Sequence, residues 1–378
     1  MTQRHALLAQ VLALSVALLG AMAISSLLIL LFGQAPAHIY ALMLEETLGS
    51  GYGIGQVLFK ATPLLFSGLS VALAFRAGLF NIGAEGQIVL GAFAAAMTGI
   101  ALPADTPSWL AVPLCGLAAF VGGALVGLIP GLLKAFTGAH EVINTLMLNF
   151  IVQAVLEHAG RHVFMPETMH TAQVIAGARL TPLAALIPPL RGSAASTAFF
   201  GALGAAALVW LFLFFTRPGF RLRALGLSPT AAECAGIRPK VALALAMALA
   251  GGIAGLGGTA SVLGHKGYYE TGFSGGVGFM GIAVALLGKN HPFGIVAASL
   301  LFGFLSQAGL VINALVPKEL VEVLQAIVII ALAAASPWAR EVLERSLGRS
   351  GTAAHTAPSH DASAPSHAAS GPTTGARP

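Results

Sequence analysis

Long apolar runs recur along most of this chain and are separated by short polar connections. Ten such segments can be marked, at approximately 6–32, 56–75, 86–103, 109–133, 143–158, 196–216, 240–264, 276–288, 292–313 and 319–336. A helix needs roughly 20 apolar residues to cross the hydrocarbon core of a bilayer. Only 9% of the residues are charged, whereas a soluble domain carries about 25%. The sequence therefore predicts an all-α protein, a polytopic transmembrane helical bundle of about ten spans.

The lysines and arginines are distributed unevenly between the two sides of such a bundle. With the N-terminus inside, the inner side collects Arg4, Arg76, Lys134, Arg217, Arg221, Arg223, Arg238, Lys240, Lys289, Arg340, Arg345 and Arg349. The outer side collects Arg161, Arg179, Arg191, Lys266 and Lys318. Cytoplasmic loops are enriched in these residues, so both termini are predicted to be cytoplasmic. The positive charge is spread over short connections, as membrane topology requires. The sequence contains no basic run interleaved with aromatic residues, so we predict no nucleic-acid partner.

The composition divides the chain into two parts. Residues 1–340 are predicted to form the transmembrane domain, and residues 341–378 a disordered cytoplasmic tail rich in Ala, Ser, Pro and His. His355, His360 and His367 in this tail are irregularly spaced. Because no cluster has metal-ligand spacing, we predict neither a metal site nor a cofactor.

Lys60 is the one strong charge set within a predicted span. An ionisable group at that depth is a functional candidate. The alternative is that its long stem carries the ammonium group outward to the membrane surface.

The most unusual polar stretch is RAGLFNIGAEGQ, at residues 76–87. Asn81 and Glu85 are four residues apart and would share one face of a continuous helix. A carboxylate facing lipid is costly, so Glu85 is expected to face the bundle interior or an interface. The alternative is a tight turn between two helices, whose polar groups satisfy one another.

Two further stretches face the predicted inner side. One is HEVINTLMLN at 140–149, and the other is GIAVALLGKNHP at 281–292. The Gly-Lys pair in the second lacks the rest of a phosphate-binding loop, because Ala283 and Asn290 stand where that motif needs Gly and Ser or Thr. We therefore predict no ATP hydrolysis by this chain.

The stretch SPTAAECAGI, at 228–237, is predicted to be a short helix on the inner surface. Ser228 is a favourable N-cap and Pro229 suits the first helical position. Gly236 is a suitable C-terminal stop. A soluble partner can bind such an exposed helix.

Taken in this order along the chain, GLFNIGAEGQ at 78–87, HEVINTLMLN, SPTAAECAGI and GIAVALLGKNHP resemble the permease subunits of ABC importers for nucleosides. These importers depend on BMP-type lipoproteins and belong to the wider group of ribose and branched-chain amino-acid permeases. The resemblance covers about residues 1–340. It implies a heterodimer with a second homologous permease, two ATPase subunits, an extracytoplasmic substrate-binding lipoprotein, and a place in the bacterial plasma membrane.

The resemblance also implies roles for individual residues. Contact with the ATPases would fall on Ser228, Thr230, Glu233 and Gly236, and secondarily on His140, Glu141 and Lys289. The translocation path or its gate would involve Phe80, Asn81, Glu85, Gln87 and Asn149. The alternative for these polar side chains is that they hold helices together.

Other functions remain open. A permease for simple sugars such as ribose is the alternative within the same class. An ion-coupled secondary carrier would work alone and would need ionisable groups within the membrane, for which only Lys60 and Glu85 are clear candidates. A membrane-embedded enzyme would need a catalytic set near one face, and the sequence shows none.

Overall fold

A computed structural model describes residues 3–317 and 320–331, and within them the regular secondary structure is helical apart from isolated β-bridges. The all-α prediction is confirmed. The α-helices are α1 (Gln3–Leu31), α2 (Pro36–Leu48), α3 (Gly51–Arg76), α4 (Ala84–Ala101), α5 (Ser108–Thr137), α6 (Glu141–Val163), α7 (Ala198–Phe215), α8 (Arg217–Leu227), α9 (Pro229–Cys234), α10 (Pro239–Leu256), α11 (Thr259–Ser261), α12 (Val277–Leu287) and α13 (Pro292–Ile312). Shorter helical turns are η1 (Ala176–Ala178), η2 (Leu183–Ala185), η3 (Pro188–Leu190) and η4 (Val262–Lys266).

Seven helices of the described part are long and apolar enough to cross a membrane, or up to eight if the bent pair α1 and α2 is one span. This is fewer than the predicted ten. Segment 276–288 contains only the 11-residue α12, which is about 16 Å long at 1.5 Å per residue and reaches roughly half-way across a bilayer core. The last segment is described only over Leu320–Ala331. The predicted tail, with its three histidines, lies outside the described residues.

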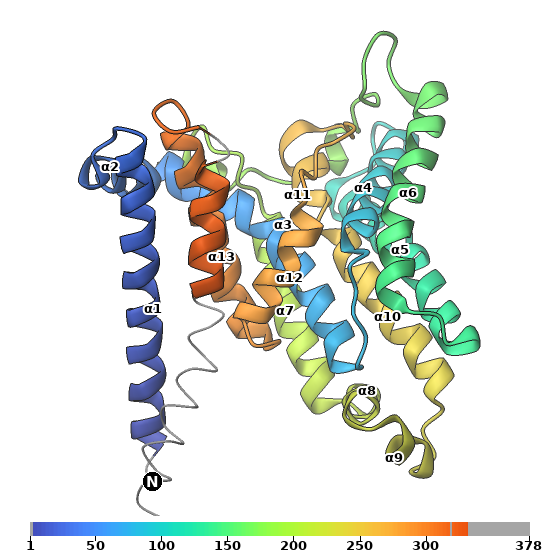
Figure 1. The fold of residues 1–378 in the computed structure, drawn as a ribbon. Coiled ribbons are helices and arrows are strands. Elements are labelled where there is room, and N and C mark those ends of the chain that lie inside the picture. The colour runs from blue at the N-terminus through green and yellow to red at the C-terminus, as the bar shows by residue number, and fades with distance from the viewer. Residues whose placement is uncertain (1–2, 318–319, 332–378) are drawn as a thin grey trace, which may run out of the picture.

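Residues 36–48 lie outside the ten apolar segments marked in the sequence, yet they form α2, which is bent by 112° from α1. Pro36 begins this helix, a position where its missing N–H costs nothing. Figure 1 shows α2 at the end of the molecule opposite to α8 and α9, which lie at the same end as the start of α1. The bundle therefore has two distinct ends, and α8 and α9 mark one of them.

Close approach of α5 and α10 holds one side of the bundle together. A methyl group added to Gly123 would overlap the carbonyl oxygen of Gly251, and one added to Gly255 would overlap that of Ala119. In lipid, where water does not drive helices together, such small residues allow tight van der Waals packing of backbones. The glycine-rich sequence of α10 is therefore a packing surface.

Lys60 ties α3 to α13. Its ammonium group donates a hydrogen bond to the carbonyl oxygen of Ser306 at 3.0 Å, and its Nζ lies 3.4 Å from the hydroxyl of the same residue. The side chain is half-buried, and its aliphatic stem carries the ammonium group from α3 to the backbone of α13.

Candidate functional site

The loop between α3 and α4 sets the geometry of the polar stretch at 76–87. Gly78 takes a left-handed conformation, with φ of 74°, just after α3 ends, and α4 begins only at Ala84. Asn81 therefore lies in the loop and Glu85 in the first turn of α4, so the two do not share a continuous helix. The Asn81 side chain itself favours the turn, because its Oδ1 accepts the N–H of Gly83 at 3.1 Å.

Asn81 and Gln87 form a reciprocal pair of amides in the protein interior. The Asn81 Nδ2 donates to Gln87 Oε1 at 2.8 Å and to Ser70 Oγ at 3.0 Å, and Gln87 Nε2 donates to Asn81 Oδ1 at 3.1 Å. All three side chains are fully buried. Phe80 packs edge-on against Phe75, with ring centroids 4.8 Å apart. These contacts fix the loop against α3 and α4.

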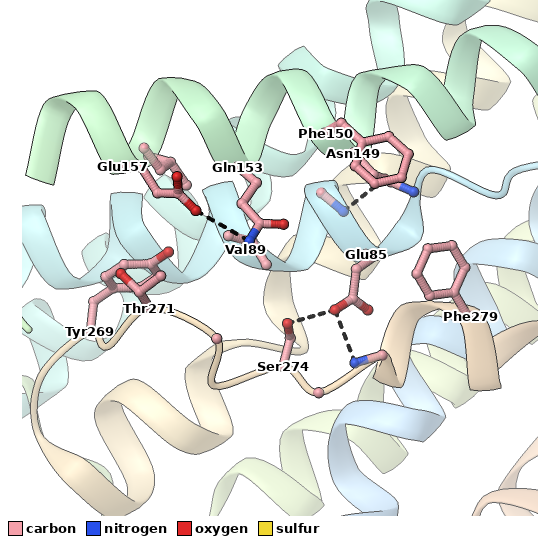
Figure 2. A pocket seen from close by; sticks show the side chains of 15 residues that line it. Glu85, Val89, Asn149, Phe150, Gln153, Glu157, Tyr269, Thr271, Ser274 and Phe279 are labelled. Atoms are coloured by element: carbon pink, nitrogen blue, oxygen red, sulfur yellow. Dashed lines mark hydrogen bonds between the residues drawn. The ribbon is translucent and has the colours of Figure 1, made fainter. Parts of the chain in front are cut away.

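Glu85 faces the start of α12 instead of this amide pair. Its Oε1 accepts the Ser274 hydroxyl at 2.6 Å and the Gly276 N–H at 3.1 Å, and its Oε2 accepts the Gly278 N–H at 2.6 Å. Figure 2 shows the carboxylate pointing at the loop that leads into α12. A helix N-terminus has unpaired N–H groups and a partial positive charge, so Glu85 acts as its cap. Gly278 allows this approach, because a methyl group there would overlap the backbone of Glu85.

Asn149 connects α6 to the same region. Its Oδ1 accepts the N–H of Gly86 at 2.9 Å, and its Nδ2 donates to the carbonyl oxygen of Ile82 at 3.1 Å. The side chain therefore satisfies one backbone donor in the first turn of α4 and one acceptor in the preceding loop. Three elements, α4, α6 and the start of α12, are held together by Asn149 and Glu85.

A cavity of about 260 Å³ lies between these three elements (Figure 2). This is just below the roughly 300–1,000 Å³ that is usual for small-molecule sites. Its polar and aromatic lining consists of Glu85, Asn149, Phe150, Gln153, Glu157, Tyr269, Thr271, Ser274 and Phe279. No lysine, arginine or histidine is among the described residues that line it. The walls thus offer carboxylates, amides, hydroxyls and phenyl rings, and they disfavour an anion.

Of the predicted path residues, the structure brings Glu85 and Asn149 to this cavity and leaves Phe80, Asn81 and Gln87 out of its lining. The sequence analysis missed the remaining polar residues of α6. Asn149, Gln153 and Glu157 recur every fourth residue and therefore share one helix face, and Gln153 donates to Glu157 at 3.3 Å. This four-residue spacing is the sequence signal from which the polar face of α6 could have been predicted.

Tyr269 forms the end of the cavity opposite to Phe279 in Figure 2. Its ring packs edge-on against Phe93 at 5.3 Å between centroids, and its side chain is buried. Burial, and secondarily the charge of Glu157, raise the pKa of Tyr269 to about 12. The phenol therefore stays protonated at neutral pH and remains a hydrogen-bond donor.

The predicted short helix at 228–237 is confirmed as α9. The Ser228 hydroxyl accepts the Ala231 N–H at 3.3 Å, and Gly236 ends the element with a φ of 81°. Thr230 and Glu233 are exposed. The preceding helix α8 was not predicted. Its buried positions, Gly219, Leu222 and Leu225, are three residues apart, and this spacing seats one face on the bundle.

The secondary candidates for ATPase contact lie on two other turns. His140 precedes α6, and Glu141 forms an ion pair with Lys134 across the α5–α6 connection at 2.9 Å. Lys289 lies in the turn between α12 and α13, where its φ of 53° is left-handed. The structure does not bring these residues into one cluster with α9.

Helix α8 packs directly on the loop that leads to Glu85. Gly226 and Gly78 abut, and a methyl group on Gly226 would overlap the carbonyl oxygen of Arg76. Arg76 in turn donates two hydrogen bonds, at 3.0 and 3.2 Å, to the carbonyl oxygen of Asn290. The end of α3, the end of α8 and the α12–α13 turn therefore form one packed unit.

A bundle of long apolar helices, with a polar cavity between α4, α6 and the start of α12, defines the class of this protein, a multi-pass membrane protein. The chain belongs to the family described as branched-chain amino acid transport system / permease component, which it matches over residues 53–333. It is a component of a transport system, with several membrane spans in the bacterial plasma membrane.

Individual relatives cover most of the chain. A guanosine ABC transporter permease of Bacillus subtilis is 36% identical over 84% of this chain and 91% of its own length. A nucleoside ABC transporter permease of Lactococcus lactis is 36% identical over 82% of this chain and 87% of its own length. A glucose ABC transporter permease of Haloferax volcanii is 35% identical over 83% of this chain and 84% of its own length. No solved structure matches.

The amide pair behind the cavity leads to a stability prediction. Asn81→Ala leaves the buried polar groups of Gln87 and Ser70 without their partner, and we expect the free energy of unfolding to fall by about 2–3 kcal/mol. Thermal unfolding of the purified protein in detergent measures the effect. Asn144→Ala is the matched control, because the Asn144 amide nitrogen is buried without a partner. Equal melting temperatures for the two variants would contradict a structural role for the pair.

Proposed function

We propose that this chain is one of two homologous permeases in an ATP-driven, binding-protein-dependent importer of nucleosides. In this proposal a second permease completes the membrane path, two ATPase subunits bind the α8–α9 end, and an extracytoplasmic lipoprotein delivers the cargo. The observation that carries the substrate class is the cavity, whose lining combines hydrogen-bonding groups and phenyl rings and has no basic side chain among the described residues. The nucleoside permeases among the relatives support it.

The chemistry of a nucleoside is complementary to these walls. Its ribose hydroxyls are donors, for which the carboxylates of Glu85 and Glu157 are acceptors. Its base is a flat, partly apolar ring that stacks on Phe150 or Phe279. Amide and phenol groups, such as those of Gln153 and Tyr269, pair with the polar edge of the base. Glu85 and Asn149 then line the path, while Asn81, Gln87 and Phe80 position the loop behind it.

We propose ten spans with both termini in the cytoplasm. This orientation is supported because basic residues cluster at the end of the bundle that carries α8 and α9, and cytoplasmic ends are enriched in such residues. They are Lys134, Arg217, Arg221, Arg223, Arg238, Lys240 and Lys289. In this orientation α12 belongs to the eighth crossing of the chain and the described helix Leu320–Ala331 to the tenth. Helix α9 is then the ATPase-contacting element, and α8 links it to the loop before Glu85.

Simple sugars are the second candidate, because the glucose permease of Haloferax volcanii is nearly as similar. The complete importer in proteoliposomes separates the two by uptake of labelled nucleosides in competition with ribose and glucose. We expect uptake that requires ATP and the binding protein and that is inhibited by nucleosides only. Competition by sugars alone would replace the nucleoside assignment. Uptake by this chain alone, without ATP, would instead establish an ion-coupled carrier.

Charge reversal on α9 tests the docking of the ATPase. Glu233→Lys adds a positive charge to an exposed helix that is proposed to contact the ATPase, and we expect its affinity to fall roughly three- to tenfold. Quantitative co-purification of the ATPase measures this change. Glu167→Lys is the control, because Glu167 is also exposed and lies on the α6–η1 connection at the other end of the molecule. Wild-type subunit ratios in both variants would contradict the assignment of α9.

A further inference from the structure

A second cavity, of about 490 Å³, is a groove between α7, α8 and α10. It lies away from the cavity at Glu85 and shares no lining residue with it. Six of its lining residues carry the argument. Four are apolar, Phe212, Val241, Leu245 and Leu249, and two are basic, Arg221 and Arg238.

The apolar wall of the groove runs along a membrane span. Val241, Leu245 and Leu249 recur every fourth residue of α10 and therefore form one stripe on its surface. Val241 and Leu245 are more than half exposed, at 52% and 55%. An exposed aliphatic stripe of this kind offers a surface on which a lipid acyl chain can pack.

Both arginines are at the end of this stripe where the span meets water. Arg238 immediately precedes α10, and Arg221 is on α8, which lies at the lower end of the bundle in Figure 1. Both side chains are exposed. Neither has an ion pair or a side-chain hydrogen bond among the described residues, and no carboxylate is in the groove lining. By contrast, Lys134 on a neighbouring connection is paired with Glu141.

We propose that this groove binds an anionic phospholipid. Its phosphate lies between Arg221 and Arg238, and one acyl chain follows the stripe of Val241, Leu245 and Leu249. Guanidinium groups are well suited to phosphate oxygens, and basic pockets between spans at a membrane surface are typical sites for acidic headgroups. A soluble partner accounts for the arginines but not for an aliphatic wall that continues along the span.

The lipid would also affect the packing of the bundle. The groove is bounded by α8 on one side and α10 on the other, and these helices flank α9 in the sequence. A bound phospholipid contacts both and would fill the space between them. We therefore expect anionic lipid to stabilise the α8–α10 end of the protein.

The test uses the complete importer, purified in detergent and titrated with phosphatidylglycerol or phosphatidylcholine. Native mass spectrometry and the thermal midpoint report binding. We expect tighter binding of phosphatidylglycerol, and binding roughly thirtyfold weaker in the double variant R221Q/R238Q, since each basic residue near a membrane surface contributes roughly a fivefold change in affinity. R217Q is the charge control, because Arg217 is exposed on the same helix but outside the groove lining.

A steric variant tests the acyl-chain part separately. Leu245→Trp fills the groove and should weaken phosphatidylglycerol binding with both arginines intact. Leu208→Trp, at an exposed position of α7 outside the groove lining, should not. Equal binding of the two lipids, or unchanged binding in R221Q/R238Q and Leu245→Trp, would overturn the proposal. A stabilising shift with inorganic phosphate alone, or loss of the ATPase with lipid binding unchanged, would also overturn it.

Discussion

Uptake is expected to fall at least about tenfold when Glu85 is replaced by alanine. The carboxylate accepts three hydrogen bonds from Ser274, Gly276 and Gly278 at the start of α12. Bonds to a charged acceptor are worth about 1.5–3 kcal/mol each, so their joint loss destabilises the contact between α4 and α12 by several kcal/mol. Uptake of labelled nucleoside into proteoliposomes, normalised to the amount of assembled importer, measures the effect.

The graded variants make this result specific. Glu85→Gln keeps one acceptor oxygen and should be intermediate, because both carboxylate oxygens are used in the wild type. Ser274→Ala removes only one of the three bonds and should be the mildest. Uptake at the wild-type rate in Glu85→Ala, with normal assembly, would show that the cap on α12 has no part in transport.

The second large effect is expected from Gly123→Val on α5. A side chain at Gly123 would overlap the backbone of Gly251 on α10. Backbone atoms cannot relieve such a clash by changing rotamer, as a side chain could. Overpacking typically costs about 1–3 kcal/mol, and a backbone clash belongs at or above the upper end of that range. We expect loss of a monodisperse peak in fluorescence-detected gel filtration, or a large drop of the thermal midpoint.

Gly116→Val is the matched control on the same helix. An added Cβ at Gly116 meets nothing within 4 Å. The two substitutions therefore share the same helix-propensity change and differ only in the contact with α10. Equal behaviour of Gly116→Val and Gly123→Val would mean that close contact of α5 and α10 does not hold the bundle together.

Hydropathy was sufficient to locate most helices. The segment predicted at 109–133 corresponds to α5 at Ser108–Thr137, and that at 292–313 to α13 at Pro292–Ile312. A bilayer requires each span to have a continuous apolar run of sufficient length, and such a run can be recognised directly in the sequence. The capped helix α9 was also predictable, because Ser228 and Gly236 act within their own turn.

The length of an apolar segment did not predict the ends of a helix where tertiary contacts determine them. The start of α12 depends on Glu85, which precedes Ser274 by 189 residues, and no local pattern reports that pairing. The same holds for the cavity, whose walls come from α4, α6 and the segment before α12. The resemblance groups Asn81 and Gln87 with Glu85 as path residues, and only their burial and mutual pairing in the structure set them apart from it.

Glu85 is shared by two helix N-termini, since it belongs to the first turn of α4 and caps α12. Each N-terminus carries roughly half a positive charge, so the two together offset about one carboxylate. The fixed negative charge of Glu85 is therefore largely offset by the peptide backbone at the starts of α4 and α12. The passage of the neutral nucleoside proposed above would move no net charge past this point, and its uptake should depend little on membrane potential.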